Sequence, residues 1–159
     1  MSDIVKLKYK PLIGQSIPNL ESFAESHGEK PFRGRQLFDW IYRQQVDDVS
    51  AMTDLSKPFR EKLANVLIHP LKMVTGNVSV SKQTQKILFE LLDGNLLESV
   101  LMKEGNRITV CLSTQVGCAV DCDFCATAKM GFIKNLTTGE IVDQFLQLQK
   151  MSEQKITNV

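Results

Sequence analysis

Residues 115–125 read Gln115-Val116-Gly117-Cys118-Ala119-Val120-Asp121-Cys122-Asp123-Phe124-Cys125, which places three cysteines in the spacing C-x₃-C-x₂-C. Three thiolates on one short loop can bind three irons of a cubane [4Fe–4S] cluster, whereas a cluster bound only by the protein takes four cysteines. The fourth iron would then be free to bind a small molecule. The spacing therefore favours an open iron–sulfur site.

Two other interpretations of these cysteines remain open. Cys122 and Cys125 form a C-x-x-C pair, which is also typical of a redox dithiol or of half a zinc site. A structural zinc ion needs four ligands, and the remaining candidates are Cys111, His27 and His69. Neither histidine has a metal-ligand neighbour in the sequence, and a dithiol would not need Cys118. The sequence thus favours iron–sulfur over zinc, and zinc over dithiol chemistry.

Composition limits the class of protein. At 159 residues, 43% of them hydrophobic, the chain has room for one or two small globular domains. Nineteen Lys and Arg against eighteen Asp and Glu give a net charge of +1, so any contact with nucleic acid must come from a local patch. We find no signal peptide and no apolar run of membrane-spanning length, and we expect a reducing, cytoplasmic location rather than a disulfide framework.

Residues 1–70 have helical periodicity. Pro18 to Gly28 and Arg33 to Gln44 each carry apolar residues at helical spacing, the second with Trp40 in a wide apolar stripe. Ser56 before Pro58 is a plausible cap and early helical proline for a third helix. Helices this short must pack together to be stable, so we expect a small helical domain.

Residues 71–159 change to an α/β pattern. Three β-rich runs, Lys86–Asp93, Leu96–Lys103 and Arg107–Thr114, are separated by the turn sequences DGN and EGN, which predicts a β-meander. Thr137 to Glu140 forms a capping box, and Ile141, Phe145, Leu148 and Met151 would line the buried face of the helix that follows. Strand, loop, helix and the start of a strand form the first βα unit of a parallel barrel, with the cysteine loop where such folds bind cofactors.

Several motifs around the cysteines belong together. They are Val110–Cys118, Cys122–Thr127, Lys129–Phe132 and Asn135–Val142, preceded by Lys30–Tyr42 near the N-terminus. In this combination the chain resembles the radical SAM methyltransferases that act on adenosines of ribosomal and transfer RNA, above all the type that methylates adenosine C2. The resemblance covers nearly the whole chain.

The resemblance implies a fold and a chemistry. The fold would be a helix-hairpin-helix-like accessory and RNA-binding domain, a β-meander and the start of a truncated radical SAM (β/α) barrel. The cofactors would be a [4Fe–4S] cluster on Cys118, Cys122 and Cys125 and S-adenosylmethionine, with 23S ribosomal RNA and the transfer RNA anticodon loop as substrates. An external electron donor of flavodoxin type would be a further partner. The cluster chemistry is that of the cofactor, not of protein side chains.

The family also has parts that lie beyond Val159: a Gly-Glu-Pro-type segment that binds S-adenosylmethionine, and a C-terminal cysteine that carries the methyl group. We therefore expect this chain alone to be inactive and a complementing C-terminal half to be a possible partner. Two alternatives stay open, namely part of a C8-methylating resistance relative, or an inactive RNA-binding or zinc-stabilised fragment with an exposed sheet edge.

The resemblance assigns roles to three further residues. Glu98 matches the candidate base that removes a proton from the methylated adenosine, although a lone acid in an apolar strand ordinarily points to solvent. Cys111 matches the cysteine that pairs transiently with the methyl-carrying cysteine, although a free strand cysteine is ordinarily buried. Phe124 matches an aromatic that packs close to the cluster and S-adenosylmethionine.

A basic and aromatic patch is the candidate RNA contact. Arg33, Arg35 and Arg43 lie beside Trp40 and Tyr42, and Lys30 and Lys57 could add to the surface. Cations interleaved with aromatics can bind phosphates and stack on unpaired bases. A helix with a core stripe and a solvated basic face explains the arginines equally well, and for Trp40 we favour the core.

Overall fold

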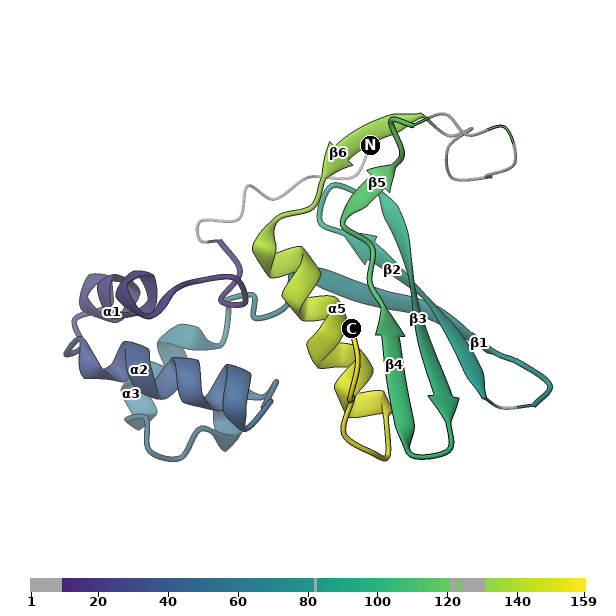
Figure 1. Cartoon of the computed structure of the whole chain (residues 1–159). Coiled ribbons are helices and arrows are strands. Elements are labelled where there is room, and N and C mark those ends of the chain that lie inside the picture. Colours follow the sequence, from purple (N-terminus) through teal and green to yellow (C-terminus); the bar gives the residue numbers. More distant parts are fainter. Residues whose placement is uncertain (1–9, 82, 121–122, 124–130) are drawn as a thin grey trace. The chain divides into compact units, whose positions relative to one another are not determined.

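The computed structural model describes residues 10–81, 83–120, 123 and 131–159 (Figure 1). The chain divides into two compact units, Met1–His69 and Pro70–Val159. In the described residues, no helix combines the length and the apolar character needed to cross a membrane.

The first unit is helical. Its elements are α1 (Ile17–Ser26), α2 (Phe32–Phe38), a π-helical turn (Asp39–Arg43), a 3₁₀ turn (Val49–Ala51) and α3 (Lys57–Leu63). The hydroxyl oxygens of Ser16 and Ser56 accept backbone N–H groups at the starts of α1 and α3, and each helix has proline in its first turn. These caps bond donors that a helix cannot bond itself. The buried apolar residues of the helices and of the segment before α3 include Leu20, Ala24, Leu37, Ile41, Met52, Leu55, Phe59 and Leu63.

A glycine sets the distance between α1 and α2. A Cβ atom at Gly34 would lie 2.3 Å from the backbone nitrogen of Glu21, so only glycine permits this approach. The helix expected from Arg33 to Gln44 is helical throughout, but its second half is a π-helical turn and not an α-helix. In this turn the N–H of Gln44 donates to the carbonyl of Asp39, five residues before it. A π-type turn of this kind rotates the following side chains relative to an α-helix.

The second unit contains a four-stranded antiparallel sheet in the order β1 (Leu71–Val78), β2 (Thr84–Leu91), β3 (Leu96–Glu104), β4 (Arg107–Cys111). The predicted meander is confirmed for β2 to β4. Strand β1 was not expected, because only Leu71 in it is buried and a bulge between Met73 and Thr75 breaks its alternation.

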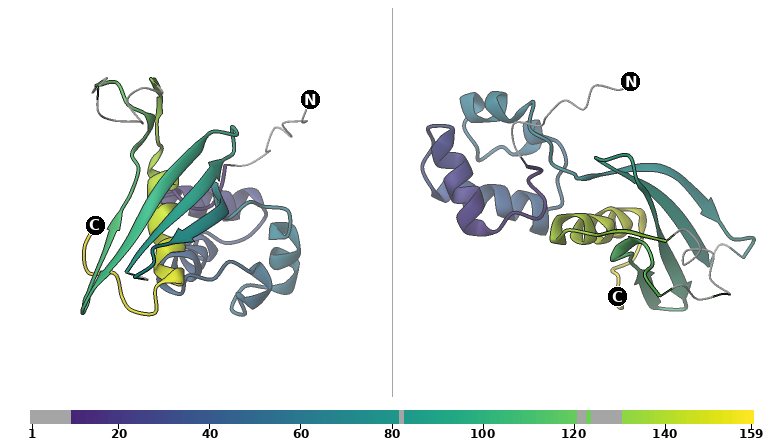
Figure 2. Two further views of the ribbon diagram at one scale, coloured as in Figure 1. Left: turned by 90° about the vertical axis from the view of Figure 1, so that its right-hand side faces the viewer. Right: turned by 90° about the horizontal axis from the view of Figure 1, so that it is seen from above.

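Helix α5 (Thr138–Met151) covers one face of this sheet (Figure 2). Its predicted capping box is present, and Leu148 is fully buried, while Ile141, Phe145 and Met151 pack against the same core. From the sheet, alternate residues contribute Ile87, Phe89, Leu97, Ile108 and Val110. We call the other side, which no described element of this unit covers, the open face of the sheet.

After α5 the chain returns beside β4. Thr109 and Asn158 form a parallel bridge, and the N–H of Val110 donates to the carbonyl of Asn158 at 3.0 Å. A strand, a covering helix and a returning parallel segment are thus observed. A complete barrel remains a prediction.

A short hairpin closes the cysteine loop at its base. Strands β5 (Gln115–Gly117) and β6 (Phe132–Asn135) pair antiparallel, and the N–H of Cys118 donates to the carbonyl of Gly131 at 3.1 Å. Gly117 has φ +73°, and a Cβ there would lie 1.8 Å from the carbonyl oxygen of Gly131. Glycine is required at this position for two reasons, its backbone conformation and the closeness of the facing strand.

Replacing Gly117 with alanine should therefore open the base of the loop. Gly131→Ala is the matched control, since Gly131 also has positive φ (+72°) but would place its Cβ in open space. The control carries only the cost of a left-handed conformation, roughly 1–2 kcal/mol. Amide hydrogen exchange at Cys118 measures the difference. We expect protection to fall much further in Gly117→Ala, and equal protection in the two variants would contradict the steric argument.

Candidate functional site

The cysteine loop begins at the end of the β5 strand. Cys118 is half-buried and free, and its sulfur accepts the N–H of Val120 at 3.5 Å. The thiolate is the form in which cysteine binds a metal. Cys122, Phe124 and Cys125 lie outside the described residues. No group of three His, Cys, Asp or Glu side chains that could hold a metal occurs among the residues that are described.

A buried glutamine fixes the segment that leads into this loop. Gln144 of α5 is fully buried, and its Oε1 accepts the hydroxyl of Ser99 at 2.7 Å and the N–H of Ser113 at 2.8 Å. Its Nε2 donates to the carbonyls of Ser113 and Glu140, both at 3.0 Å. Both donors and both acceptor positions of the amide are thus used. The side chain ties α5, β3 and the residues after β4 together.

This glutamine also explains where β4 ends. The sequence predicts strand as far as Thr114, but the ladder stops at Cys111. Beyond it, the backbone N–H and carbonyl of Ser113 bond to the Gln144 amide, and the carbonyl of Thr114 accepts the N–H of Leu136. These backbone groups turn from the sheet toward the hairpin stem.

Glu98 lies on the open face of the sheet. Its side chain is 53% exposed, and its carboxylate forms an ion pair with Lys86 of β2, with 2.8 Å between Nζ and Oε2. Its backbone carbonyl accepts the hydroxyl of Ser113 at 2.7 Å, which links Glu98 to the Gln144 cluster.

Cys111 is on the same face. It is the exposed last residue of β4 and is paired in register with Val100 of β3. Because side chains alternate along a strand, Val100 and Glu98 point to one side of β3, so Glu98 and Cys111 are diagonal neighbours. The structure therefore places two of the predicted site residues, Glu98 of β3 and Cys111 of β4, next to each other. They lie near the end of β4 from which the chain continues to Cys118.

A charged cluster holds the other side of the hairpin stem. Lys134 Nζ of β6 donates to Asp93 at 2.6 Å and to the capping-box residue Glu140 at 3.0 Å. Burial alone would lower the pKa of Lys134, but the hydrogen bonds and charges of the two carboxylates outweigh it and raise that pKa. Burial would raise the pKa of Asp93, but hydrogen bonds from Lys134 and Asn95 outweigh it and lower that pKa. The charged forms of both groups are therefore favoured, which anchors the stem to α5 and the β2–β3 turn.

The arginines of the candidate RNA patch are all engaged within the first unit. Each arginine forms an ion pair. The pairs are Arg33 with Glu29 (3.9 Å), Arg35 with Glu21 (2.6 Å) and Arg43 with Asp39 (3.4 Å). Arg35 and Arg43 remain 70% and 77% exposed, so their solvent-facing sides stay accessible.

The aromatic residues of the patch are also engaged. Trp40 is half-buried and its indole N–H donates to Asp54, while the hydroxyl of Tyr42 accepts the N–H of Gly14 at 2.7 Å. Trp40 is therefore neither a fully buried core residue nor a free stacking platform. RNA binding by this patch stays a prediction.

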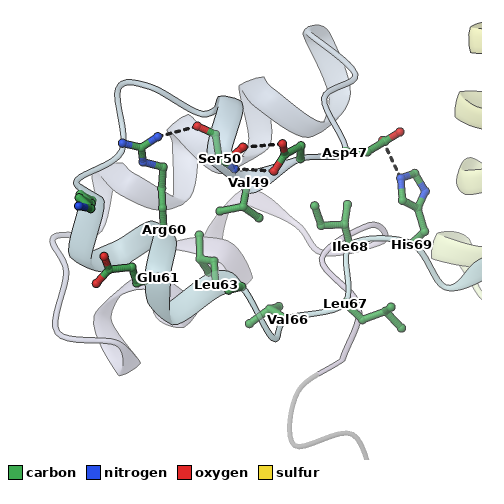
Figure 3. Close-up of a pocket in the computed structure, with 13 residues that line it drawn as sticks. Asp47, Val49, Ser50, Arg60, Glu61, Leu63, Val66, Leu67, Ile68 and His69 are labelled. Carbon is green, nitrogen blue, oxygen red and sulfur yellow. Dashed lines mark hydrogen bonds and ion pairs between the residues drawn. The ribbon is translucent and has the colours of Figure 1, made fainter.

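An open pocket of about 630 Å³ lies elsewhere in the first unit (Figure 3). Apolar side chains such as Val49, Leu63 and Ile68 line it, and Arg60 Nη1 donates to the carbonyl of Ser50 at 2.6 Å beside it. Its margin carries acids as well as bases, including Asp47, whose carboxylate is hydrogen-bonded to His69 Nε2 at 2.7 Å. This mixture of charges does not select for a phosphate.

Sequence reasoning missed the buried polar residues of α5. Besides Gln144, Asp143 is fully buried and accepts the N–H of Leu71 at the start of β1 at 3.0 Å. A signal for Gln144 was available: it lies three residues after Ile141 and four before Leu148, on the predicted apolar stripe. A polar residue on such a stripe needs a buried partner.

Known proteins match this chain in sequence and in fold. Residues 11–68 match the family described as "Ribosomal RNA large subunit methyltransferase N-terminal domain". A probable dual-specificity RNA methyltransferase RlmN of Synechocystis sp. is 42% identical over 94% of this chain and 42% of its own length. Its counterpart in Thermotoga petrophila is 44% identical over 100% of this chain and 44% of its own length.

A solved structure agrees with these matches. A radical SAM methyltransferase from Sphaerobacter thermophilus superposes with a TM-score of 0.84 at 40% identity, over 94% of this chain and 45% of that chain. The chain thus spans less than half the length of the relatives it matches. By sequence and by fold, the chain is similar to the N-terminal part of the RlmN-type RNA methyltransferases and to a radical SAM methyltransferase.

Proposed function

We propose that this chain supplies the cluster-binding loop and the proton acceptor of a radical SAM enzyme that methylates C2 of adenosine in 23S ribosomal RNA and in the transfer RNA anticodon loop. The observation that carries the proposal is the arrangement around β4. A three-cysteine loop on a glycine-dependent stem follows this strand, and Glu98 and Cys111 lie on the open face beside the strand's end. The relatives that match are named as dual-specificity RNA methyltransferases and as a radical SAM methyltransferase.

The donor set fits an open [4Fe–4S] cluster. Cys118, Cys122 and Cys125 would be its three ligands, and no fourth cysteine stands in the loop. Cys118 is free, in no disulfide, as a metal ligand must be. When bound, the cluster supplies the electron that cleaves S-adenosylmethionine. Phe124, between two ligands, would exclude water from the cluster.

The open face would hold the reacting adenosine. Glu98 would accept the proton from adenosine C2, because it is an accessible carboxylate on β3, the strand next to the one that carries Cys111. Cys111 is free and exposed, as a residue that forms a transient disulfide must be. The exposed arginines Arg35 and Arg43 would contribute phosphate contacts from the first unit.

The first test concerns the metal. Anaerobic reconstitution of this chain should give a [4Fe–4S] protein, and Cys118→Ala, Cys122→Ala or Cys125→Ala should each abolish iron binding. Cys111→Ala is the matched control and should keep its iron. Iron and sulfide analysis with Mössbauer spectroscopy gives the readout. Stoichiometric zinc without iron uptake, or loss of iron in Cys111→Ala, would contradict the ligand assignment.

The second test concerns Glu98 and uses a whole-length enzyme that contains this segment. The Glu98→Gln enzyme should still form the covalent bond to adenosine. The adduct should then keep its C2 proton, because the variant has no base to accept it. Removal of a general base typically slows a reaction on the order of 10²–10⁴-fold. We therefore expect a protein–RNA crosslink on a denaturing gel and little free methyladenosine. Turnover near the normal rate would mean that Glu98 is an ordinary solvent-facing acid, and failure before any crosslink would mean a role in docking RNA.

A further inference from the structure

We propose that Lys86 is the positioning residue for Glu98, and that it holds the carboxylate in place for proton transfer from adenosine C2. This inference rests on the proposed function and extends it to a residue on a different strand. Its basis is the ion pair of Lys86 Nζ with Glu98 Oε2 at 2.8 Å.

The pair is formed across the β2–β3 ladder. Lys86 is in register with Val100, and Glu98 is in register with Leu88, so the two charged residues are diagonal neighbours on the open face. Val100 is in turn in register with Cys111. Lys86, Val100 and Cys111 therefore form one row across three strands, and Glu98 lies beside that row.

Stability does not explain this pair. Both side chains are 53% exposed, and ion pairs between exposed residues contribute little to folding. A second pair on the open face, Lys72 with Glu90, is longer at 3.8 Å and lies toward the β1 edge, away from Cys111. The other charged residues on this face of β3 and β4, Glu104 and Arg107, lie at the opposite end of the ladder.

A held carboxylate suits the proposed proton transfer. An unpaired glutamate on a strand samples many rotamers, whereas a charge-assisted hydrogen bond selects one direction. With Oε2 bound to the ammonium group, the proton would be accepted at Oε1. The C2–H bond breaks, its electron pair stays on the adenine ring, and the carboxylate becomes a carboxylic acid. A base must be within hydrogen-bonding reach of the proton that it removes, so orientation directly affects the rate.

The test compares three variants in a whole-length enzyme that contains this segment. Lys86→Met removes the ammonium group, Lys86→Arg keeps a cation, and Lys72→Met removes the matched pair on the same face. We expect Lys86→Met to slow methyladenosine formation roughly 10- to 100-fold, the range for removal of a group that orients a reactive one. The same variant should accumulate the protein–RNA crosslink, Lys86→Arg should recover most of the rate, and Lys72→Met should behave like the parent.

The outcomes separate this inference from the proposed function. Parent-like turnover in Lys86→Met, alongside stalled turnover in Glu98→Gln, would overturn the positioning role and leave Glu98 as the base. Normal turnover in Glu98→Gln would overturn both. Loss of Lys86→Met activity before any crosslink forms would overturn positioning in favour of RNA docking. The melting temperature is the folding control. If it equals that of the parent, the slow reaction of the Lys86→Met enzyme is not caused by unfolding.

Discussion

The candidate site depends on one buried amide. Gln144 of α5 makes four hydrogen bonds, to Ser99, to both backbone groups of Ser113 and to Glu140, in the centre of the second unit. A buried amide with any of these partners missing would carry an unsatisfied polar group, at a cost of roughly 1–3 kcal/mol. The network therefore specifies one arrangement of helix, strand and loop entry. It ends β4 at Cys111 and directs the chain into the hairpin that carries Cys118.

The sheet beside this network has two faces of different character. On the α5 side, alternate residues of β2 to β4 form the apolar core. On the open side, the alternate positions carry Glu98, Lys86 and Cys111, which are accessible and polar. Ser113 joins the two, because its backbone bonds Gln144 while its hydroxyl bonds the carbonyl of Glu98. A rigid core thus fixes the direction of residues proposed to act on RNA, as a catalytic constellation requires.

Local signals in the sequence were enough for much of this fold. The alternation in β2 to β4, the turns between them and the Thr137–Glu140 capping box depend on neighbouring residues only, and all are present. Strand β1 and the β5–β6 hairpin were missed, because a bulge disrupts the first and long-range glycine contacts define the second. Gln144 was missed because periodicity considers apolar residues, while its role comes from partners 31 and 45 positions away. The cysteine spacing predicts a metal site, but two of the proposed ligands, Cys122 and Cys125, lie outside the described residues, so both the ligand set and the cluster geometry stay predictions.

Amide hydrogen exchange in Gln144→Leu tests the dependence on this amide most directly. Leucine is similar in volume but can make none of the four hydrogen bonds. We expect the N–H of Ser113 and of Cys118 to lose protection, while the β2–β3 ladder, which does not use Gln144, keeps its own. Unchanged protection at Ser113 and Cys118 would contradict the account, since the loop entry would then be held by something other than the buried amide.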